Sequence, residues 1–295
     1  MPAVLLRAFF KSMDEYFYKT DCFSLVNTFN NGQCFRWTQT GQDSFEGVAF
    51  GRALRLRQCR DGVAFACGRE DFALWQEYFD LDTDYAGIQE RYSRDEAILP
   101  CVEAGAGMHL LRQELWEVLI SFIVSQNNNI TRIKGIIRRL CENYGREFEA
   151  YGQRFYAFPS AEELSAASAQ QLEKLGLGYR ADYVEKCAKT VCEQPLLLDN
   201  FREMNYNQAR EALLNVRGIG PKVANCILLF GLRHLSAFPV DTWIHKAMIS
   251  LYPECGSTNS QIEAFAAERF GDNAGIAQQY IFYAARQGKV SLFNQ

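Results

Sequence analysis

The sequence lacks the usual patterns of a metal site. It has no C-x-x-C pair, no H-E-x-x-H run and only three histidines, so no zinc site can be placed. The four-cysteine loop that would hold an iron–sulfur cluster is also missing. We therefore expect the ten scattered cysteines to be mostly reduced and buried as small hydrophobic residues.

Long apolar runs are also missing. No stretch approaches the ~20 apolar residues of a transmembrane helix, so we expect no membrane partner. The apolar start of residues 1–19 is interrupted by Arg7 and followed by acidic residues, which is not the pattern of a signal peptide. Fixed-period repeats and low-complexity linkers are absent as well.

What is present is enough for a sizeable core. The 295 residues are 48% hydrophobic and 22% charged, which suits one large domain or two ordinary ones. The net charge of −4 argues against a protein that coats nucleic acid, but it allows a local binding surface.

The first third of the chain carries the pattern of strands. Four short runs rich in aromatic residues and valine, with the dipeptide Asp61-Gly62 as a hairpin turn, predict an antiparallel sheet at 33–39, 44–50, 53–59 and 62–67.

From about residue 70 the pattern becomes helical. We expect helices at 69–79, 114–126, 131–145, 161–175, 180–193, 207–216, 221–232, 241–252, 258–269 and 273–286. Because strands come first and helices follow, the fold class is α+β: an N-terminal antiparallel β-sheet domain over 1–108 and a helical region over 109–295.

The acidic run at 80–84, DLDTD, invites a comparison with a calcium loop. A calcium-binding EF-hand needs Gly at its sixth position and Glu at its twelfth, where this chain has Tyr85 and Arg91. We therefore interpret the run as a helix-ending turn with solvated carboxylates.

Residues 207–232 predict a helical hairpin. An amphipathic helix is followed by the turn RGIG and by a second helix with Pro221 at its first position. Gly218 and Gly220 allow a positive φ and close approach to another chain, and the amides at the start of the second helix suit a phosphate. An ordinary structural hairpin explains the segment equally well. Lys222 is poorly placed for stability there, since a helix N-terminus is already positive.

About twenty residues later, Asp241 follows Pro239-Val240 and precedes a new helix. Taken alone it is an N-cap candidate. The hairpin GIGPK followed by Pro-x-Asp, however, resembles the signature of the helix-hairpin-helix (HhH-GPD) DNA glycosylase superfamily. The segments 32–37, 121–141, 175–184, 218–226, 239–246 and 275–286 together resemble its 8-oxoguanine DNA glycosylase branch, over nearly the whole chain and in order.

The resemblance implies a bifunctional DNA glycosylase and lyase. Its partner is double-stranded DNA with 8-oxoguanine opposite cytosine, and the target base is flipped out of the duplex. Lys222 is the expected nucleophile that forms a Schiff base, and its position does not favour an ammonium group. Asp241 stabilises positive charge on the sugar and can still cap its helix. No cofactor is needed for this chemistry.

The resemblance also assigns a base pocket. The Gly32 carbonyl accepts the hydrogen on N7 that separates 8-oxoguanine from guanine. Gln278 bonds the base edge, while Phe282 and Cys226 sandwich its ring. From the residues alone, the alternative for Gly32 is a turn into a strand, and the alternative for Phe282 and Cys226 is a place in the core.

Four further residues match those that contact the DNA opposite the lesion. Asn127, Arg132 and Arg180 correspond to the residues that read the orphaned cytosine, and Tyr179 to the side chain that fills the vacated stack. A solvated face is the alternative for the two arginines, and a helix cap is the alternative for the asparagine.

The chain departs from the family at Trp243, where animal members commonly carry histidine, so a phosphate contact by that side chain is not implied. Similar hairpins hold a monovalent cation through backbone carbonyls. A monomer is expected, at the nucleoid of a bacterium or in a eukaryotic nucleus. A related glycosylase for another oxidised or alkylated base, or a non-catalytic DNA-binding module, are the alternative functions; Lys222 together with Asp241 argues against the latter.

Overall fold

The computed structural model describes residues 15–290. The prediction that residues 1–19 form no signal peptide falls mainly on positions 1–14, outside the described residues. Within the described part, no helix has both the length and the apolarity needed to cross a membrane.

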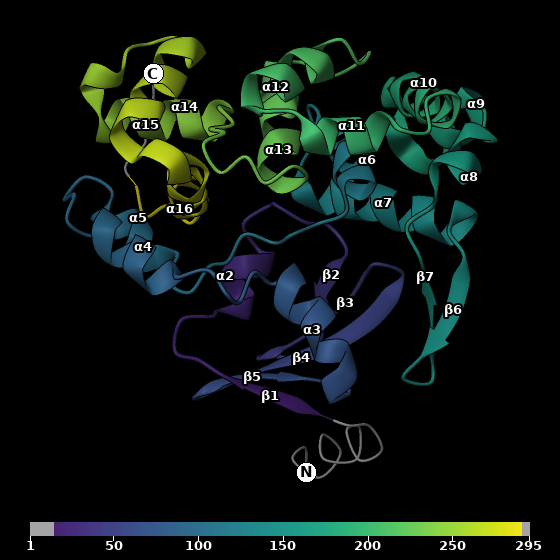
Figure 1. The fold of residues 1–295 in the computed structure, drawn as a ribbon, viewed down its shortest axis with the longest axis horizontal. Helices are drawn as coiled ribbons and strands as arrows, with labels where there is room; N and C mark the ends of the chain where they lie inside the picture. The colour runs from purple at the N-terminus through teal and green to yellow at the C-terminus, as the bar shows by residue number, and fades with distance from the viewer. Residues whose placement is uncertain (1–14, 291–295) are drawn as a thin grey trace.

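The N-terminal part is a five-stranded antiparallel sheet, as the sequence predicts (Figure 1). The order β1-β5-β4-β3-β2 is formed by β1 (Tyr16–Lys19), β2 (Trp37–Gln39), β3 (Ser44–Ala49), β4 (Arg52–Cys59) and β5 (Gly62–Phe65). Strand β1 was not predicted. Cys59 pairs with Gly62, so Arg60 and Asp61 form the turn, one residue earlier than expected.

One face of the sheet is covered by α3 (Arg69–Tyr78), with α2 (Leu25–Phe29) beside it (Figure 1). Leu54 and Leu56 of β4 alternate with less buried arginines, as a half-buried strand requires. Their partners are large rings, including Trp37 and Trp75, both almost fully buried. The sheet and these helices therefore have an apolar core of their own.

The rest of the chain is mostly helical. The helices are α4 (Tyr85–Tyr92), α5 (Leu99–Ala104), α6 (Leu115–Ser125), α7 (Ile130–Tyr144), α8 (Ala161–Ser165), α9 (Ala169–Leu172), α10 (Arg180–Glu193), α11 (Leu197–Glu203), α12 (Tyr206–Leu214), α13 (Pro221–Phe230), α14 (Thr242–Leu251), α15 (Asn259–Phe270) and α16 (Ala274–Arg286). A β-hairpin, β6 (Glu147–Ala150) and β7 (Gln153–Tyr156), interrupts them.

The helix predicted at 161–175 is broken into three pieces. Ser160 and Ser168 each begin a new helix with a capping box, and a π-helical turn (Glu173–Leu177) follows α9. Gly176 inside that turn has φ +92°, which no regular helix tolerates. The apolar period runs through these breaks, which is why the sequence predicted one helix.

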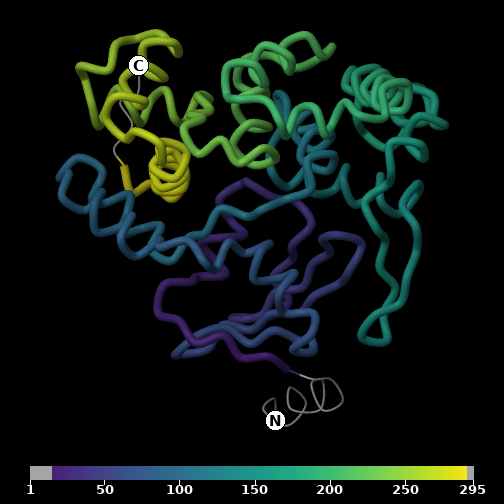
Figure 2. The backbone as a smooth tube through the Cα atoms, viewed as in Figure 1, coloured from purple at the N-terminus to yellow at the C-terminus, as the bar shows by residue number. Residues whose placement is uncertain are grey.

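Helices α4 and α5 lie beside the C-terminal helix α16, far from them in sequence (Figures 1 and 2). The Tyr92 hydroxyl donates to the Asn273 carbonyl at 2.9 Å across this contact. Residues 85–104 thus fall within the predicted 1–108 domain but pack in the helical core.

The prediction for Asp80 in the DLDTD run is wrong. Its carboxylate is fully buried rather than solvated, and it accepts bonds from Arg112 (2.8 Å), Arg233 (2.6 Å) and the Tyr85 hydroxyl (2.8 Å). Both arginines belong to distant segments, so no local pattern predicts them. Burial raises the pKa of Asp80, but Arg233, Tyr85 and Arg112 outweigh burial and hold it below its ordinary value. We call these four residues the Asp80 junction.

The prediction for the cysteines is confirmed. All ten are free thiols, and most are buried. Burial raises the pKa of Cys34 to about 12, for example, so this thiol is inert rather than reactive.

Candidate active site

The predicted helical hairpin is formed by α12, the loop 215–220 and α13. Gly218 has φ +87°, as predicted, and a Cβ there would lie 2.5 Å from the Tyr183 ring. Gly220 does not have the predicted positive φ: at −94° it is the extended N-cap residue of α13. Pro221 is the first residue of α13, as predicted. The turn therefore depends on one glycine, while the other begins the helix.

Lys222 is the second residue of α13 and is half-buried. Its Nζ lies 5.6 Å from the centre of the Phe122 ring, which belongs to α6. Burial raises the pKa of the Cys226 thiol, one turn further along α13, and the charge and a hydrogen bond of Lys222 oppose that shift. Lys222 and Cys226 therefore face the same space.

Asp241 is the N-cap of α14, as the sequence suggested. Its Oδ1 accepts the backbone N–H groups of Trp243 (3.0 Å) and Ile244 (2.9 Å). Both bonds use one oxygen, so the other carboxylate oxygen stays outside the cap. The Trp243 side chain is 43% exposed beside it.

These side chains meet around one small cavity, which we call the base pocket. Its volume is about 40 Å³, and it is lined by Asn31, Gly32, Phe122, Lys222, Cys226, Phe230, Pro239, Asp241, Gln278, Gln279 and Phe282. All six residues predicted for catalysis and base binding are among them. The sequence missed Asn31 and Gln279, although each is a polar neighbour of a predicted residue, and two adjacent glutamines in a buried helix are an unusual signal.

Gly32 forms one end of the base pocket. It has φ +81°, and a Cβ there would lie 3.2 Å from Ile130 and 3.3 Å from the Phe282 ring. The turn expected before β2 and the pocket wall are therefore the same feature. Any side chain at this position would be strained and would press on the ring.

Gln278 is held in place by other polar groups. It is buried, its Nε2 donates to the Pro239 carbonyl (3.0 Å), and its Oε1 accepts from Gln279 Nε2 (2.7 Å). Its partner Pro239 stands two residues before Asp241, so this helix also fixes the segment that presents the aspartate.

The predicted DNA-facing residues form a second cluster. Asn127, in the loop after α6, donates to the Tyr179 hydroxyl at 3.2 Å, and the Arg180 guanidinium lies 4.5 Å from the centre of the Tyr179 ring. Tyr179 is 53% exposed. Arg132 is exposed at the start of α7 and donates to the Gly176 carbonyl at 3.4 Å.

Arg180 differs from Arg132 because it is buried. Its guanidinium donates to the carbonyls of Leu177 (3.2 Å), Asn127 (3.1 Å) and Gln126, the last at 2.7 Å from Nε. A solvated face is therefore the wrong alternative for Arg180. Gln126 in turn donates to the Gly218 carbonyl at 2.8 Å, so the second cluster is tied to the hairpin.

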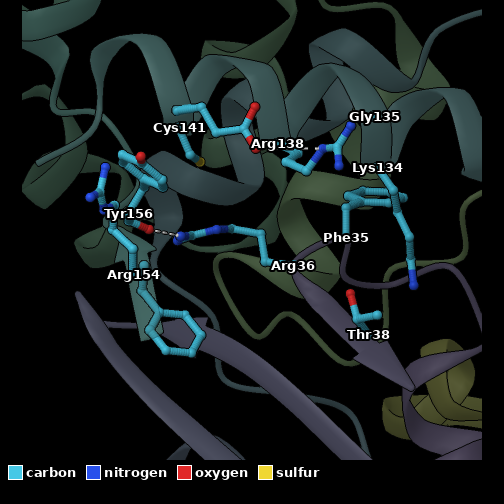
Figure 3. Close-up of a pocket in the computed structure, with 11 residues that line it drawn as sticks. Phe35, Arg36, Thr38, Lys134, Gly135, Arg138, Cys141, Arg154 and Tyr156 are labelled. Carbon is cyan, nitrogen blue, oxygen red and sulfur yellow. Dashed lines mark hydrogen bonds and ion pairs between the residues drawn. The ribbon is translucent and has the colours of Figure 1, made fainter. Parts of the chain in front are cut away.

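A larger cavity of about 430 Å³ lies elsewhere, between α7, β2 and the β6–β7 hairpin (Figure 3). Its arginines are matched by carboxylates: Arg36 by Glu117, Arg138 by Glu142 and Arg154 by Glu147, at 3.2, 3.7 and 3.3 Å. Lys134 Nζ donates to the Trp37 carbonyl at 2.8 Å. The cationic side chains of this cavity are therefore already partnered, and no predicted catalytic residue lies there.

Comparison with sequence families agrees with this arrangement. Residues 16–119 match the family described as 8-oxoguanine DNA glycosylase, N-terminal domain. Residues 120–271 match the HhH-GPD superfamily base excision DNA repair protein. Together the two matches cover the sheet, the hairpin and Asp241.

Relatives and solved structures point the same way. The N-glycosylase/DNA lyase of Saccharomyces cerevisiae is 32% identical over 75% of this chain and 66% of its own length. The N-glycosylase/DNA lyase OGG1 of Arabidopsis thaliana is 31% identical over 88% and 77%. The 8-oxoguanine glycosylase/lyase of Clostridium acetobutylicum, solved with double-stranded DNA containing cytosine opposite 8-oxoguanine, has a TM-score of 0.88 and 36% identity over 94% and 99%. The chain therefore belongs to the 8-oxoguanine DNA glycosylase branch of the HhH-GPD superfamily of base excision DNA repair proteins.

Proposed function

We propose that this protein is a bifunctional DNA glycosylase that excises 8-oxoguanine opposite cytosine and then cleaves the abasic strand. The observation that carries the proposal is the convergence of Lys222, Asp241, Cys226 and Gly32 on one pocket beside the hairpin. The names of the relatives, glycosylase and lyase, support the same pair of activities. A purely DNA-binding module would need neither the lysine nor the aspartate.

The chemistry follows from the positions of two side chains. The neutral amine of Lys222 attacks C1′, the C1′–N9 bond breaks, and its electron pair leaves with the base, which takes up a proton. The Asp241 carboxylate, with one oxygen outside the helix cap, stabilises the positive charge that develops on the sugar. The sugar ring opens to a Schiff base between C1′ and Nζ. Loss of a C2′ proton then expels the 3′ phosphate by β-elimination.

The base must enter a pocket that is narrow before DNA binds. The cavity has a volume of about 40 Å³. We expect the half-buried Phe282 ring to move and then to lie on one face of the flipped base, with Cys226 on the other. The Gly32 carbonyl would accept the N7 hydrogen. Guanine, which has a lone pair at N7, would leave that carbonyl facing another acceptor.

The second cluster would hold the opposite strand. Tyr179, already half-exposed, is suited to fill the gap left by the flipped nucleotide. Arg132 is exposed and can bond the cytosine edge directly, with Asn127 beside it. The Arg180 guanidinium already donates hydrogen bonds to carbonyls of the loop after α6. We therefore propose that Arg180 contacts cytosine only after that loop moves, and that before DNA binds it orders the loop.

A monovalent cation at the hairpin is a further part of the proposal. Carbonyl oxygens of the loop 215–220 are the hard ligands that such a cation prefers. The Gly218 carbonyl is bonded to Gln126, and the Val216 carbonyl to the Ile219 N–H, each with a second lone pair left over. DNA affinity measured in potassium and in tetramethylammonium at equal ionic strength tests this: equal affinities contradict it. We also propose that the protein acts as a monomer, at the nucleoid or in the nucleus.

The test of the proposal is a cleavage assay on duplexes that carry one 8-oxoguanine. We expect the wild type to release the base and nick the strand fastest opposite cytosine, and Arg132→Ala to lose most of that preference. Arg138→Ala, an exposed arginine on the same helix, is the matched control. Absence of released 8-oxoguanine contradicts the proposed function. Equal rates opposite all four bases contradict the assignment of Arg132.

A further inference from the structure

Two buried polar atoms on residues that line the base pocket have no hydrogen-bond partner. They are Asn31 Nδ2 and Gln279 Oε1, on side chains that are 0% and 3% exposed. Neither residue belongs to the set expected from the family resemblance. Buried polar atoms are nearly always paired, since an unpaired one is destabilising, so the exceptions point to a missing ligand.

We infer that Asn31 and Gln279 determine base specificity by bonding the edge of the flipped base. The inference rests on the proposed function and adds two residues to the recognition of its substrate. It requires that the free atom of Asn31 is a donor and that the free atom of Gln279 is an acceptor. The hydrogen-bond network fixes both.

The direction of the glutamine pair is set by a backbone carbonyl. The Pro239 carbonyl can only accept, so Gln278 must turn its NH₂ group toward it, at 3.0 Å. Gln278 Oε1 then faces Gln279, which must donate its own NH₂ group, at 2.7 Å. The remaining end of Gln279 is therefore its carbonyl oxygen, an acceptor. Reversing either amide would place two acceptors against each other.

A backbone amide fixes Asn31 in the same way. The Gln33 N–H can only donate, and it donates to Asn31 Oδ1 at 3.1 Å. The free end of Asn31 is therefore its NH₂ group. Asn31 is also next to Gly32, whose carbonyl is the proposed acceptor for the N7 hydrogen.

The residues that line the pocket thus carry an acceptor, a donor and an acceptor for the base: the Gly32 carbonyl, Asn31 Nδ2 and Gln279 Oε1. 8-Oxoguanine presents the complementary series along one edge, with hydrogen on N7, a lone pair on O6 and hydrogen on N1. 8-Oxoadenine keeps the hydrogen on N7 but carries an amino group at C6 and a lone pair on N1. It therefore mismatches two of the three positions, and a mismatch leaves buried groups unpaired. We assign Asn31 to O6 and Gln279 to N1–H.

The experiment compares excision of 8-oxoguanine with excision of 8-oxoadenine, each opposite its best partner base. Rates are single-turnover and are divided by the lyase rate of the same variant on a preformed abasic site, which contains no base to read. Asn31→Asp keeps the oxygen that accepts from Gln33 but replaces the donor by an acceptor. We expect its 8-oxoguanine to 8-oxoadenine ratio to fall about tenfold or more. Gln279→Leu removes the acceptor, and its ratio should fall severalfold.

Two surface changes are the matched controls. Asn30→Asp makes the same charge change on an exposed neighbour, and Gln287→Leu makes the same apolar change just after α16. Both should keep the wild-type ratio. Thermal denaturation checks the folding of every variant, and each of the two test variants probes one atom independently.

Ratios within twofold of wild type in both Asn31→Asp and Gln279→Leu would overturn the inference, because a merely structural role changes both rates alike. In that case a wild type active on 8-oxoguanine leaves the proposed function standing. A wild type that excises neither base overturns the proposed function and the inference together.

Discussion

Two aspartates of this molecule lie in opposite surroundings. Asp80 is fully buried, and both of its oxygens are bonded by Arg112, Arg233 and Tyr85. Asp241 is half-buried, uses one carboxylate oxygen to cap α14 and lines the base pocket. No carboxylate within residues 15–290 pairs with the nearby Lys222 inside 4.0 Å.

The comparison separates a structural network from a functional one. In the Asp80 junction every charge has a partner, so the network joins Asp80, which follows α3, to Tyr85 of α4 and to Arg233, which follows α13. The base pocket keeps a lysine with no carboxylate partner and two unpaired amide ends, which costs stability and is expected where a substrate completes the network. Five tests examine this contrast: three variants, the pH dependence of one of them, and a covalent trapping experiment.

The largest effect on stability is expected from Asp80→Asn. The change leaves two arginines without a carboxylate in a buried site and should lower the free energy of unfolding by about 3 kcal/mol. Denaturant unfolding measures it. Asp82→Asn, an exposed acid in the same turn, is the control and should stay within about 0.5 kcal/mol of wild type. Equal effects of the two changes would contradict the structural role of the junction.

The same variant gives a pH dependence with a definite sign. The pKa of Asp80 is lower in the folded protein than its ordinary value, so its contribution is complete above about pH 4 and is lost as the pH falls through the folded-state pKa. The stability difference between wild type and Asp80→Asn should therefore shrink in acid. A difference that stays constant from pH 6 to pH 2.5 would show that the charge of Asp80 is not the cause.

Asp241→Asn should reduce catalysis but leave stability nearly unchanged, whereas Asp80→Asn should reduce stability. Asparagine caps a helix as well as aspartate does, so stability should change by less than about 1 kcal/mol. Loss of the negative charge beside the sugar should slow excision by about 100-fold, measured in single turnover. A variant that excises within threefold of wild type would remove Asp241 from the catalytic step.

Helices with a strong apolar period or a clear cap were predictable from the sequence to within two residues. The boundaries of α10 were predicted at 180–193, and those of α14 and α16 lie within one residue at each end. Strand β1, the β6–β7 hairpin and the short helices α2, α4, α5, α8, α9 and α11 were not predicted as such. These elements are too short to establish a period, and tertiary packing decides their form.

In the candidate site, too, the sequence predicts the local arrangement but not the contacts between distant segments. That Lys222 and Cys226 share one helix face follows from their spacing. Gly32 and Gln279 lie at least 190 and more than 50 residues from them in sequence, so their meeting depends on tertiary packing, which no local pattern contains. The burial of Arg180 and the partners of Asp80 were hidden for the same reason. Resemblance to a family supplied the positions, but the unpaired atoms of Asn31 and Gln279 are visible only in three dimensions.

A smaller effect is expected at the hairpin. Gly218→Ala forces a side chain into a left-handed backbone and against the Tyr183 ring, which should cost about 1–3 kcal/mol and weaken DNA binding. Gly220→Ala is the matched control, because its φ is ordinary and its Cβ would meet open space. If the two variants bind DNA with equal affinity, the conformation of the turn does not determine binding to the DNA backbone.

Borohydride trapping on a duplex with 8-oxoguanine opposite cytosine tests directly whether Lys222 is the nucleophile. Wild-type protein should form a covalent adduct, and peptide mapping should place the sugar remnant on Lys222. Lys222→Gln should give no adduct, while Lys246→Gln, an exposed lysine on α14, should give as much as wild type. An adduct in Lys222→Gln, or a remnant mapped to another lysine, would contradict the claim that the base pocket is built around Lys222 as its nucleophile.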